Sequence, residues 1–190
     1  MWLVMMTAMM APTVWPWVRA SHRFGLGTQS SSHSGLATLA FIGGYVVSWA
    51  GYSIAAATVQ IALGELRLLD EPRGRLAAWP AAAILAVAGV YQLTPFKRAC
   101  LTHCRNPITY FLTRWRDGAA GGFRMGVAHG AFCVGCCWAL MGTALAVGVM
   151  SPWWMAALTI AVFVEQVTPW GLWARMPIGL ALLGGGLARL

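Results

Sequence analysis

The sequence predicts an all-α fold, a polytopic transmembrane bundle of about five to six helices with an amphipathic segment in the membrane interface. Hydrophobic residues make up 59% of the 190 residues and charged residues only 9%, whereas a soluble domain carries about 25% charged residues. Many of the eleven Trp lie near the ends of apolar runs, where an amphipathic ring suits the lipid headgroups. A water-soluble fold is therefore disfavoured, and a lipid bilayer is the expected surrounding.

Six apolar runs are the predicted spans, because backbone groups in hydrocarbon must bond within their own helix and a crossing takes about 20 residues. The first run has no basic n-region and no small-residue cleavage site, which disfavours a signal peptide. It is short for a span, so a re-entrant segment is an alternative. The six runs belong to a single membrane domain, 1–190, and cover residues 1–18, 35–63, 76–93, 122–150, 153–168 and 177–190.

The connection between the third and fourth runs, residues 94–118, has a different composition. Basic residues such as Lys97 and Arg98 are mixed there with Phe, Leu, Tyr and Trp. This mixture is typical of short helices that lie in the membrane interface, with their basic side chains among the headgroups. The segment is therefore predicted to be interfacial and amphipathic.

The basic residues also predict an orientation. A net charge of +8 could suit a nucleic-acid binder, but Lys and Arg fall between apolar runs, as they do in membrane proteins, so no nucleic-acid partner is expected. With the N-terminus outside, more basic residues lie inside than outside, which the positive-inside rule favours. The inner set is Arg19, Arg23, Lys97, Arg98, Arg105, Arg114, Arg116, Arg124 and Arg175, and the outer set is Arg67, Arg73, Arg75 and Arg189.

The fourth run carries the densest group of chemically active residues. His129, Cys133, Cys136 and Cys137 are three or four residues apart, so they share one helix face, and Met141 extends the stripe by a turn. A lone buried Cys is commonly a small hydrophobe. Three Cys within five residues instead predict a metal site, because thiolate and imidazole donors suit Cu(I) and Zn(II).

A second half-site lies in the interfacial segment, where Cys100 and Cys104 flank His103. In a helix the two thiols would share a face. The neighbouring Lys97 and Arg98 would favour the reactive thiolate. This pair is predicted to be the entry port for the metal of the fourth run.

Two further features concern the ligands. Met5, Met6, Met9 and Met10 form two i/i+4 thioether pairs in the first run; they are either core filler or ligands that favour Cu(I) over Zn(II). Glu165 stands within the fifth run, and a carboxylate inside a membrane is a functional hypothesis by default. Metal ligand, proton acceptor and buried salt-bridge partner are its three open roles.

Three stretches of the chain, residues 5–12, 91–107 and 126–141 with its Cys-x-x-Cys-Cys-Trp-Ala-Leu-Met core, resemble the bacterial predicted metal-binding integral membrane proteins, which are catalogued as a domain of unknown function. The resemblance runs over nearly the whole chain. It implies a multi-pass protein of the bacterial cytoplasmic (inner) membrane. Members have a further hydrophobic helix before the Met-rich one, and a basic residue where this chain has Gln166. The metal positions that the resemblance implies are Cys100, Cys104, His129, Cys133, Cys136, Cys137 and the methionines of the first run.

The predicted function is the binding of a transition metal, with Cu(I) favoured and Zn possible, for transport, delivery or sensing rather than catalysis. Metal captured at Cys100 and Cys104 would pass to the stripe of the fourth run by ligand exchange, and Glu165 would take up protons that the thiols release. The alternative is an intramembrane thiol–disulfide oxidoreductase in which the loop pair exchanges with Cys133 and Cys136 and electrons pass to a quinone. A scaffold without metal is the third interpretation.

Overall fold

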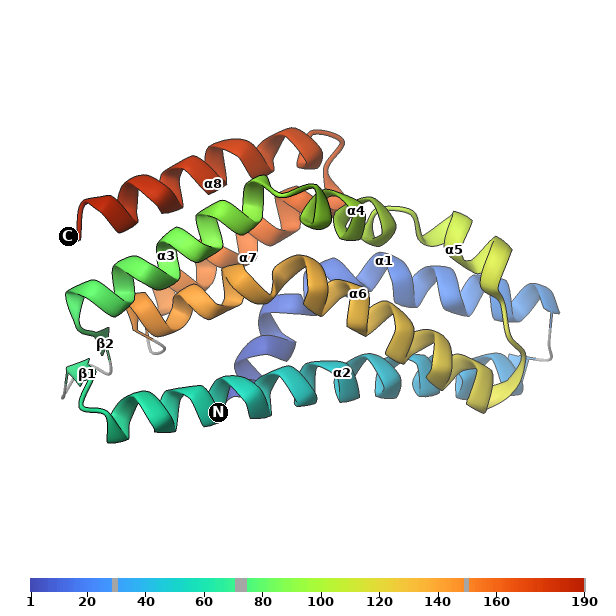
Figure 1. The fold of residues 1–190 in the computed structure, drawn as a ribbon. Coiled ribbons are helices and arrows are strands. Elements are labelled where there is room, and N and C mark those ends of the chain that lie inside the picture. Colours follow the sequence, from blue (N-terminus) through green and yellow to red (C-terminus); the bar gives the residue numbers. More distant parts are fainter. Residues whose placement is uncertain (29–30, 71–74, 149–150, 190) are drawn as a thin grey trace.

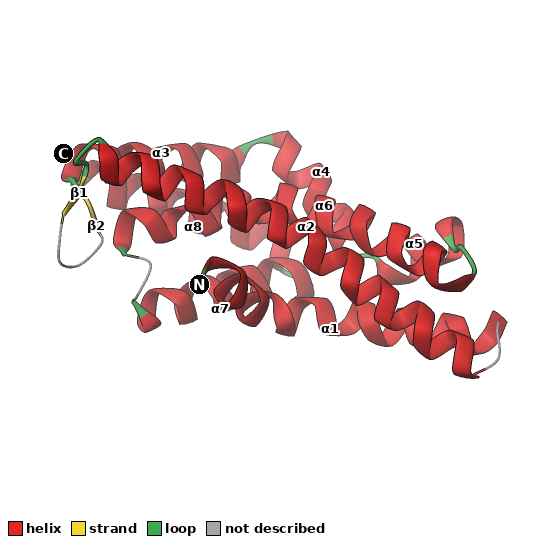
Figure 2. Cartoon of the chain, turned by 90° about the horizontal axis from the view of Figure 1, so that it is seen from below, coloured by secondary structure: helices red, strands yellow, loops and turns green. Residues whose placement is uncertain are grey.

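The computed structural model describes residues 1–28, 31–70, 75–148 and 151–189. Nearly all of this chain is helical, as Figure 2 shows, and the two strands form a very short antiparallel hairpin. The predicted all-α class is confirmed. The elements are α1 (Trp2–Thr28), α2 (Ser31–Glu65), β1 (Leu69–Asp70), β2 (Arg75–Leu76), α3 (Ala78–Leu93), α4 (Pro95–Cys104), α5 (Pro107–Arg114), α6 (Gly118–Val147), α7 (Pro152–Val167) and α8 (Gly171–Leu187).

Helix α6 lies at the centre of the bundle. It packs along α2 over most of its length, and against α3, α4 and α7 elsewhere. Figure 1 shows α6 between α2 on one side and α3 and α4 on the other, while α8 covers α3. The residues of α6 therefore meet side chains from most of the chain.

The close packing of α2 on α6 depends on glycine. A Cβ added to Gly126 of α6 would collide with the backbone oxygen of Phe41, and one added to Gly44 of α2 would collide with that of Phe123. Small residues let two helix backbones approach closely, which gives dispersion contacts without any difference in polarity from lipid. Substituting either glycine would push the two helices apart.

Two helices are long and apolar enough to cross a membrane, α6 and α2 from Ser34 onward, and α3 with α4 counts as a third if this pair, bent by 69°, is one broken span. The six predicted spans are thus not all confirmed among the described residues. Helices α3, α7 and α8 have 16 or 17 residues, and at about 1.5 Å per residue they fall short of a hydrocarbon core of roughly 30 Å.

Helix boundaries differ from the predicted ones where helices continue into polar or proline-containing sequence. Helix α1 runs to Thr28 instead of residue 18, and α8 begins at Gly171 with Pro177 inside it. The predicted ends at 150 and 190 lie outside the described residues. The interfacial segment 94–118 contains two short helices, as expected. Pro95 starts α4, where its missing N–H costs nothing, and Thr94 caps the helix by accepting from the backbone N–H of Lys97.

Candidate metal centre

The sulfur atoms of Cys133, Cys136 and Cys137 form a buried cluster on α6. All three lie within 4.8 Å of one another, and the Sγ atoms of Cys136 and Cys137 are 3.3 Å apart. The spacing of three and four residues puts the first cysteine directly behind the other two on one helix face. This geometry comes from α6 alone and needs no other element to build it.

Cys104 brings a fourth sulfur from α4. Its Sγ atom lies 3.7 Å from that of Cys136, and the carbonyl oxygen of Cys104 accepts a hydrogen bond of 3.0 Å from the Trp17 indole of α1. Cys100, one turn earlier, is half-buried, and its sulfur lies 3.5 Å from where a Cβ of Gly135 would be. The predicted half-site is therefore divided between one thiol inside the cluster and one beside it. All five cysteines are free thiols.

Gln166 of α7 contacts all three cysteines of the α6 cluster, and the sequence analysis assigned it no role. Its side-chain Nε2 lies 3.0 Å from Cys137 Sγ, 3.4 Å from Cys136 Sγ and 3.7 Å from Cys133 Sγ. An amide in an apolar helix is the signal that could have drawn attention to it, because polar groups are costly there. From α2, the Tyr45 hydroxyl lies 3.4 Å from Cys133 Sγ.

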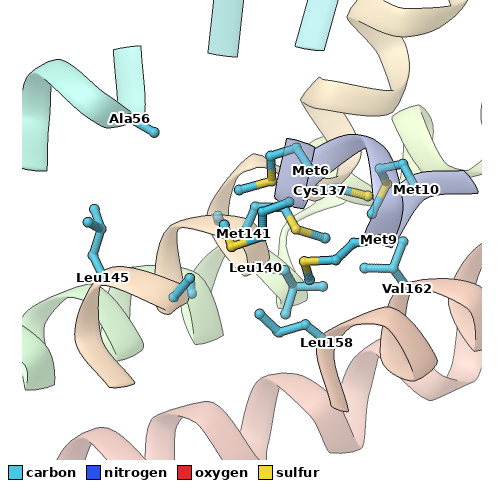
Figure 3. Close-up of a cluster of buried hydrophobic side chains, with 14 of the residues drawn as sticks. Met6, Met9, Met10, Ala56, Cys137, Leu140, Met141, Leu145, Leu158 and Val162 are labelled. Atoms are coloured by element: carbon cyan, nitrogen blue, oxygen red, sulfur yellow. The ribbon is translucent and has the colours of Figure 1, made fainter. Parts of the chain in front are cut away.

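The methionines of α1 occupy the same core as the cysteines. Met6 and Met10 are fully buried, Met5 and Met9 nearly so, and all four belong to the cluster of packed side chains that contains Cys104, Cys133, Cys136 and Cys137. Figure 3 shows Met6, Met9 and Met10 grouped with Met141 and Cys137. Thioether and thiol sulfur thus share one buried volume.

The two histidines lie outside this close group of ligand atoms among the described residues. His129 is buried one turn before Cys133, but its ring stacks on Trp17 with centroids 3.6 Å apart, and its Nδ1 has no hydrogen-bond partner in the described part of the chain. His103 stacks on Phe132 at 3.9 Å. Helical spacing predicted the face of His129 correctly, but the aromatic partners from α1 and α2 were not visible in it.

Glu165, next to Gln166, belongs to a second buried cluster. Its carboxylate accepts a hydrogen bond of 2.6 Å from Gln92 and forms an ion pair of 2.7 Å with Lys97, and all three side chains are fully buried. Of its three open roles, the salt bridge is the one present. The expectation that Lys97 lies among lipid headgroups is wrong, because the bend between α3 and α4 directs it to α7.

Two arginines extend this ion-pair cluster by binding carbonyl groups at helix ends. Arg105 donates to the carbonyl oxygens of Glu165 and Pro169, and Arg175 donates to those of Gln92 and Thr94. These carbonyls lie near the C-termini of α7 and α3, where the last turn leaves acceptors without intrahelical partners. The arginines thereby join α4 to α7 and α8 to α3.

The donor set suits a soft metal ion. Three or four thiols with neighbouring thioethers are ligands that select Cu(I), Zn(II) or iron–sulfur clusters, whereas magnesium and calcium prefer oxygen. The carboxylate of Glu165 is already engaged by Lys97. The site is accordingly one of sulfur ligands in an apolar core.

A protein-family model described as "PpoB2: Copper chaperone" matches residues 1–189. The matched range includes all five cysteines and the methionines of α1. No curated protein and no solved structure matches the chain.

Proposed function

The chain belongs to the PpoB2 family of copper chaperones, and from this premise we propose that it binds Cu(I) at Cys104, Cys133, Cys136 and Cys137 and delivers the ion to an acceptor. The observation that carries the proposal is the buried group of three sulfurs within 4.8 Å of one another. Thiols brought that close in an apolar core gain little from packing that Ala or Ser would not give, but they form a ready set of ligands for a soft ion.

Cu(I) is favoured over Zn(II) by the neighbours of the cluster. Zinc takes Cys, His, Asp and Glu ligands, yet both histidines are stacked on aromatic rings and Glu165 is bound to Lys97. The side chains that do share the core of the cluster are methionines, and thioethers select Cu(I). Met6, Met10 and Met141 would supply further ligands as the ion moves.

Entry of the ion through α4 is the second part of the proposal. Cys100 is half-buried, Cys104 follows it by one helical turn, and Cys104 Sγ lies 3.7 Å from Cys136 Sγ. A Cu(I) ion held by Cys100 could bind Cys104 before it leaves Cys100, and each thiol loses its proton as it binds. The spacing of the sulfurs thus supports transfer by stepwise ligand exchange.

The third part is location in the bacterial cytoplasmic membrane. It is supported by the length and apolar composition of α2 and α6 and by the basic residues of α4 and α5, which the positive-inside rule places on the cytoplasmic side. In this orientation Cys100 faces a reducing compartment, where thiols stay available for Cu(I).

The test is Cu(I) binding by protein purified anaerobically in detergent, with affinity measured by competition against a chromophoric chelator. Replacing Cys133, Cys136 and Cys137 together with Ser should lower the affinity at least a hundredfold, or on the order of 3 kcal/mol. Cys100→Ser is the matched control, because it removes one thiol and leaves the cluster complete. An unchanged affinity in the triple variant would place the copper site elsewhere, and a parent that takes up only zinc would exclude Cu(I).

A thiol–disulfide oxidoreductase is the second candidate, and the approach of Cys104 to Cys136 across two helices favours it. In that function these two thiols would be oxidised to a disulfide and a quinone would accept the two electrons and two protons. Alkylation of free thiols in intact cells separates the two functions. A Cys104–Cys136 disulfide that accumulates in a protein without Cu(I) affinity would replace the chaperone proposal.

A further inference from the structure

The amide of Gln166 occupies the space that a bound ion would need. An ion held by three sulfurs has to lie within bonding distance of all of them at once. The Gln166 Nε2 atom lies between 3.0 and 3.7 Å from the sulfurs of Cys133, Cys136 and Cys137. The nitrogen therefore takes the position in front of the three sulfurs that a metal ion would take.

This contact cannot persist once the ion is bound. An amide NH₂ group has two N–H donors and no free acceptor, so it cannot ligate Cu(I), and its hydrogens point toward the same sulfur lone pairs. The hydrogen bonds from Gln166 belong to the empty site. When Cu(I) enters, the side chain has to turn away from the sulfurs.

We propose that Gln166 is a positioning residue that stands in for the cargo: it holds the three sulfurs together in the empty chaperone and returns to them when Cu(I) leaves. This inference rests on the proposed function. Sulfur atoms buried without a partner are less stable than sulfur atoms that accept hydrogen bonds. An interaction made only in the empty state lowers the affinity for the ion by the free energy that it contributes.

Such a group suits a protein that must release its ion. A site that stabilises only the loaded state would hold Cu(I) ever more tightly, whereas Gln166 stabilises the state that remains after delivery. The neighbouring amide of Gln92 gives a contrast, because it is equally buried but donates to the carboxylate of Glu165. Gln92 should be bound in the same way whether or not the site holds Cu(I).

The test is Gln166→Leu, which keeps most of the side-chain volume and removes the donor. We expect Cu(I) affinity, measured by chelator competition, to rise about five- to tenfold, the factor given by losing about 1 to 1.4 kcal/mol of hydrogen bonding from the empty site alone. We expect the melting temperature of the empty protein, followed by tryptophan fluorescence, to fall while that of the loaded protein stays unchanged. Gln92→Leu is the matched control and should lower both melting temperatures without changing affinity.

Each other outcome overturns the inference. A fall in affinity would make Gln166 a ligand through its oxygen, and equal losses of stability in both states would make it a packing residue. If Gln166→Leu does not fold, Gln166→Asn, one methylene shorter, withdraws the donor and should raise the affinity likewise. A parent without Cu(I) binding overturns the proposed function as well, whereas a parent that binds with a Gln166→Leu affinity equal to its own overturns this inference alone.

Discussion

Glu165 and Gln166 are consecutive residues of α7, yet they lie in two buried clusters of opposite character. Glu165 makes contacts of 2.6 and 2.7 Å with Gln92 and Lys97, and its two oxygens each have a partner. Gln166 makes contacts of 3.0 to 3.7 Å with sulfur atoms. Charged oxygen and nitrogen in an apolar core have to be paired closely, because an unpaired buried charge is very costly.

The sulfur cluster tolerates long, weak contacts, since a thiol is a poor donor and acceptor and costs little to bury. A group bound weakly in the empty state can be given up to a metal ion at small cost. The ion-pair cluster is therefore expected to hold α3, α4 and α7 in place, and the sulfur cluster to change its contacts during function. The three predictions that follow test this division of roles.

The largest effect is expected from Lys97→Met, which leaves the Glu165 carboxylate buried and unpaired. The free energy of unfolding should fall by about 3–5 kcal/mol, measured by denaturant titration in detergent, while the folded fraction keeps its Cu(I) affinity. The double variant Lys97→Met, Glu165→Gln should recover most of this loss, because it removes both charges. Arg98→Met, at an exposed neighbour, is the control. A Cu(I) affinity lost with Lys97 would break the proposed division.

A smaller effect is expected from Cys104→Ser, which removes the fourth sulfur but leaves the three of α6. Its Cu(I) affinity should fall about tenfold, or about 1.4 kcal/mol. Cys100→Ser should keep the equilibrium affinity and slow the loading of Cu(I), measured by stopped-flow absorbance, because Cys100 lies beside the cluster and not within it. Equal affinity losses in the two variants would show that both thiols bind the ion at equilibrium.

The smallest effect is expected from His129→Phe, which keeps a ring stacked on Trp17 and removes the imidazole donor. The sequence analysis made His129 a ligand, but its nitrogens are outside the group of close ligand atoms among the described residues. The Cu(I) affinity should change by less than about threefold, or about 0.65 kcal/mol. A tenfold loss in the same competition assay would restore His129 to the metal site.

The features that depend on one helix were predictable from the sequence, and those that depend on tertiary packing were not. The spacing of Cys133, Cys136 and Cys137 determines their grouping through helix geometry alone. The pairing of Lys97 with Glu165 spans 68 positions and follows from the bend before α4. Composition indicated a basic surface segment there, because it carries no information on which way a single lysine turns.

The number of spans was difficult for a related reason. Apolar composition identifies helices that avoid water, but lipid and a protein core exclude water alike. Helices α3, α7 and α8 are apolar yet short, and much of each packs on its neighbours. Their length became clear only once the helix ends were located.

The ion pair between Lys97 and Glu165 also orders events during biosynthesis. Lys97 leaves the ribosome 68 residues before its partner, a delay of roughly 3 to 14 seconds at about 5–20 residues per second. Throughout that time its charge has no buried partner, so α4 gains more by staying at the aqueous boundary than by entering the bundle. Only when α7 has been made can α4 dock and bring Cys104 to Cys136. The fourth sulfur is thus added last, and a nascent chain cannot complete its copper site before its carboxy-terminal third exists.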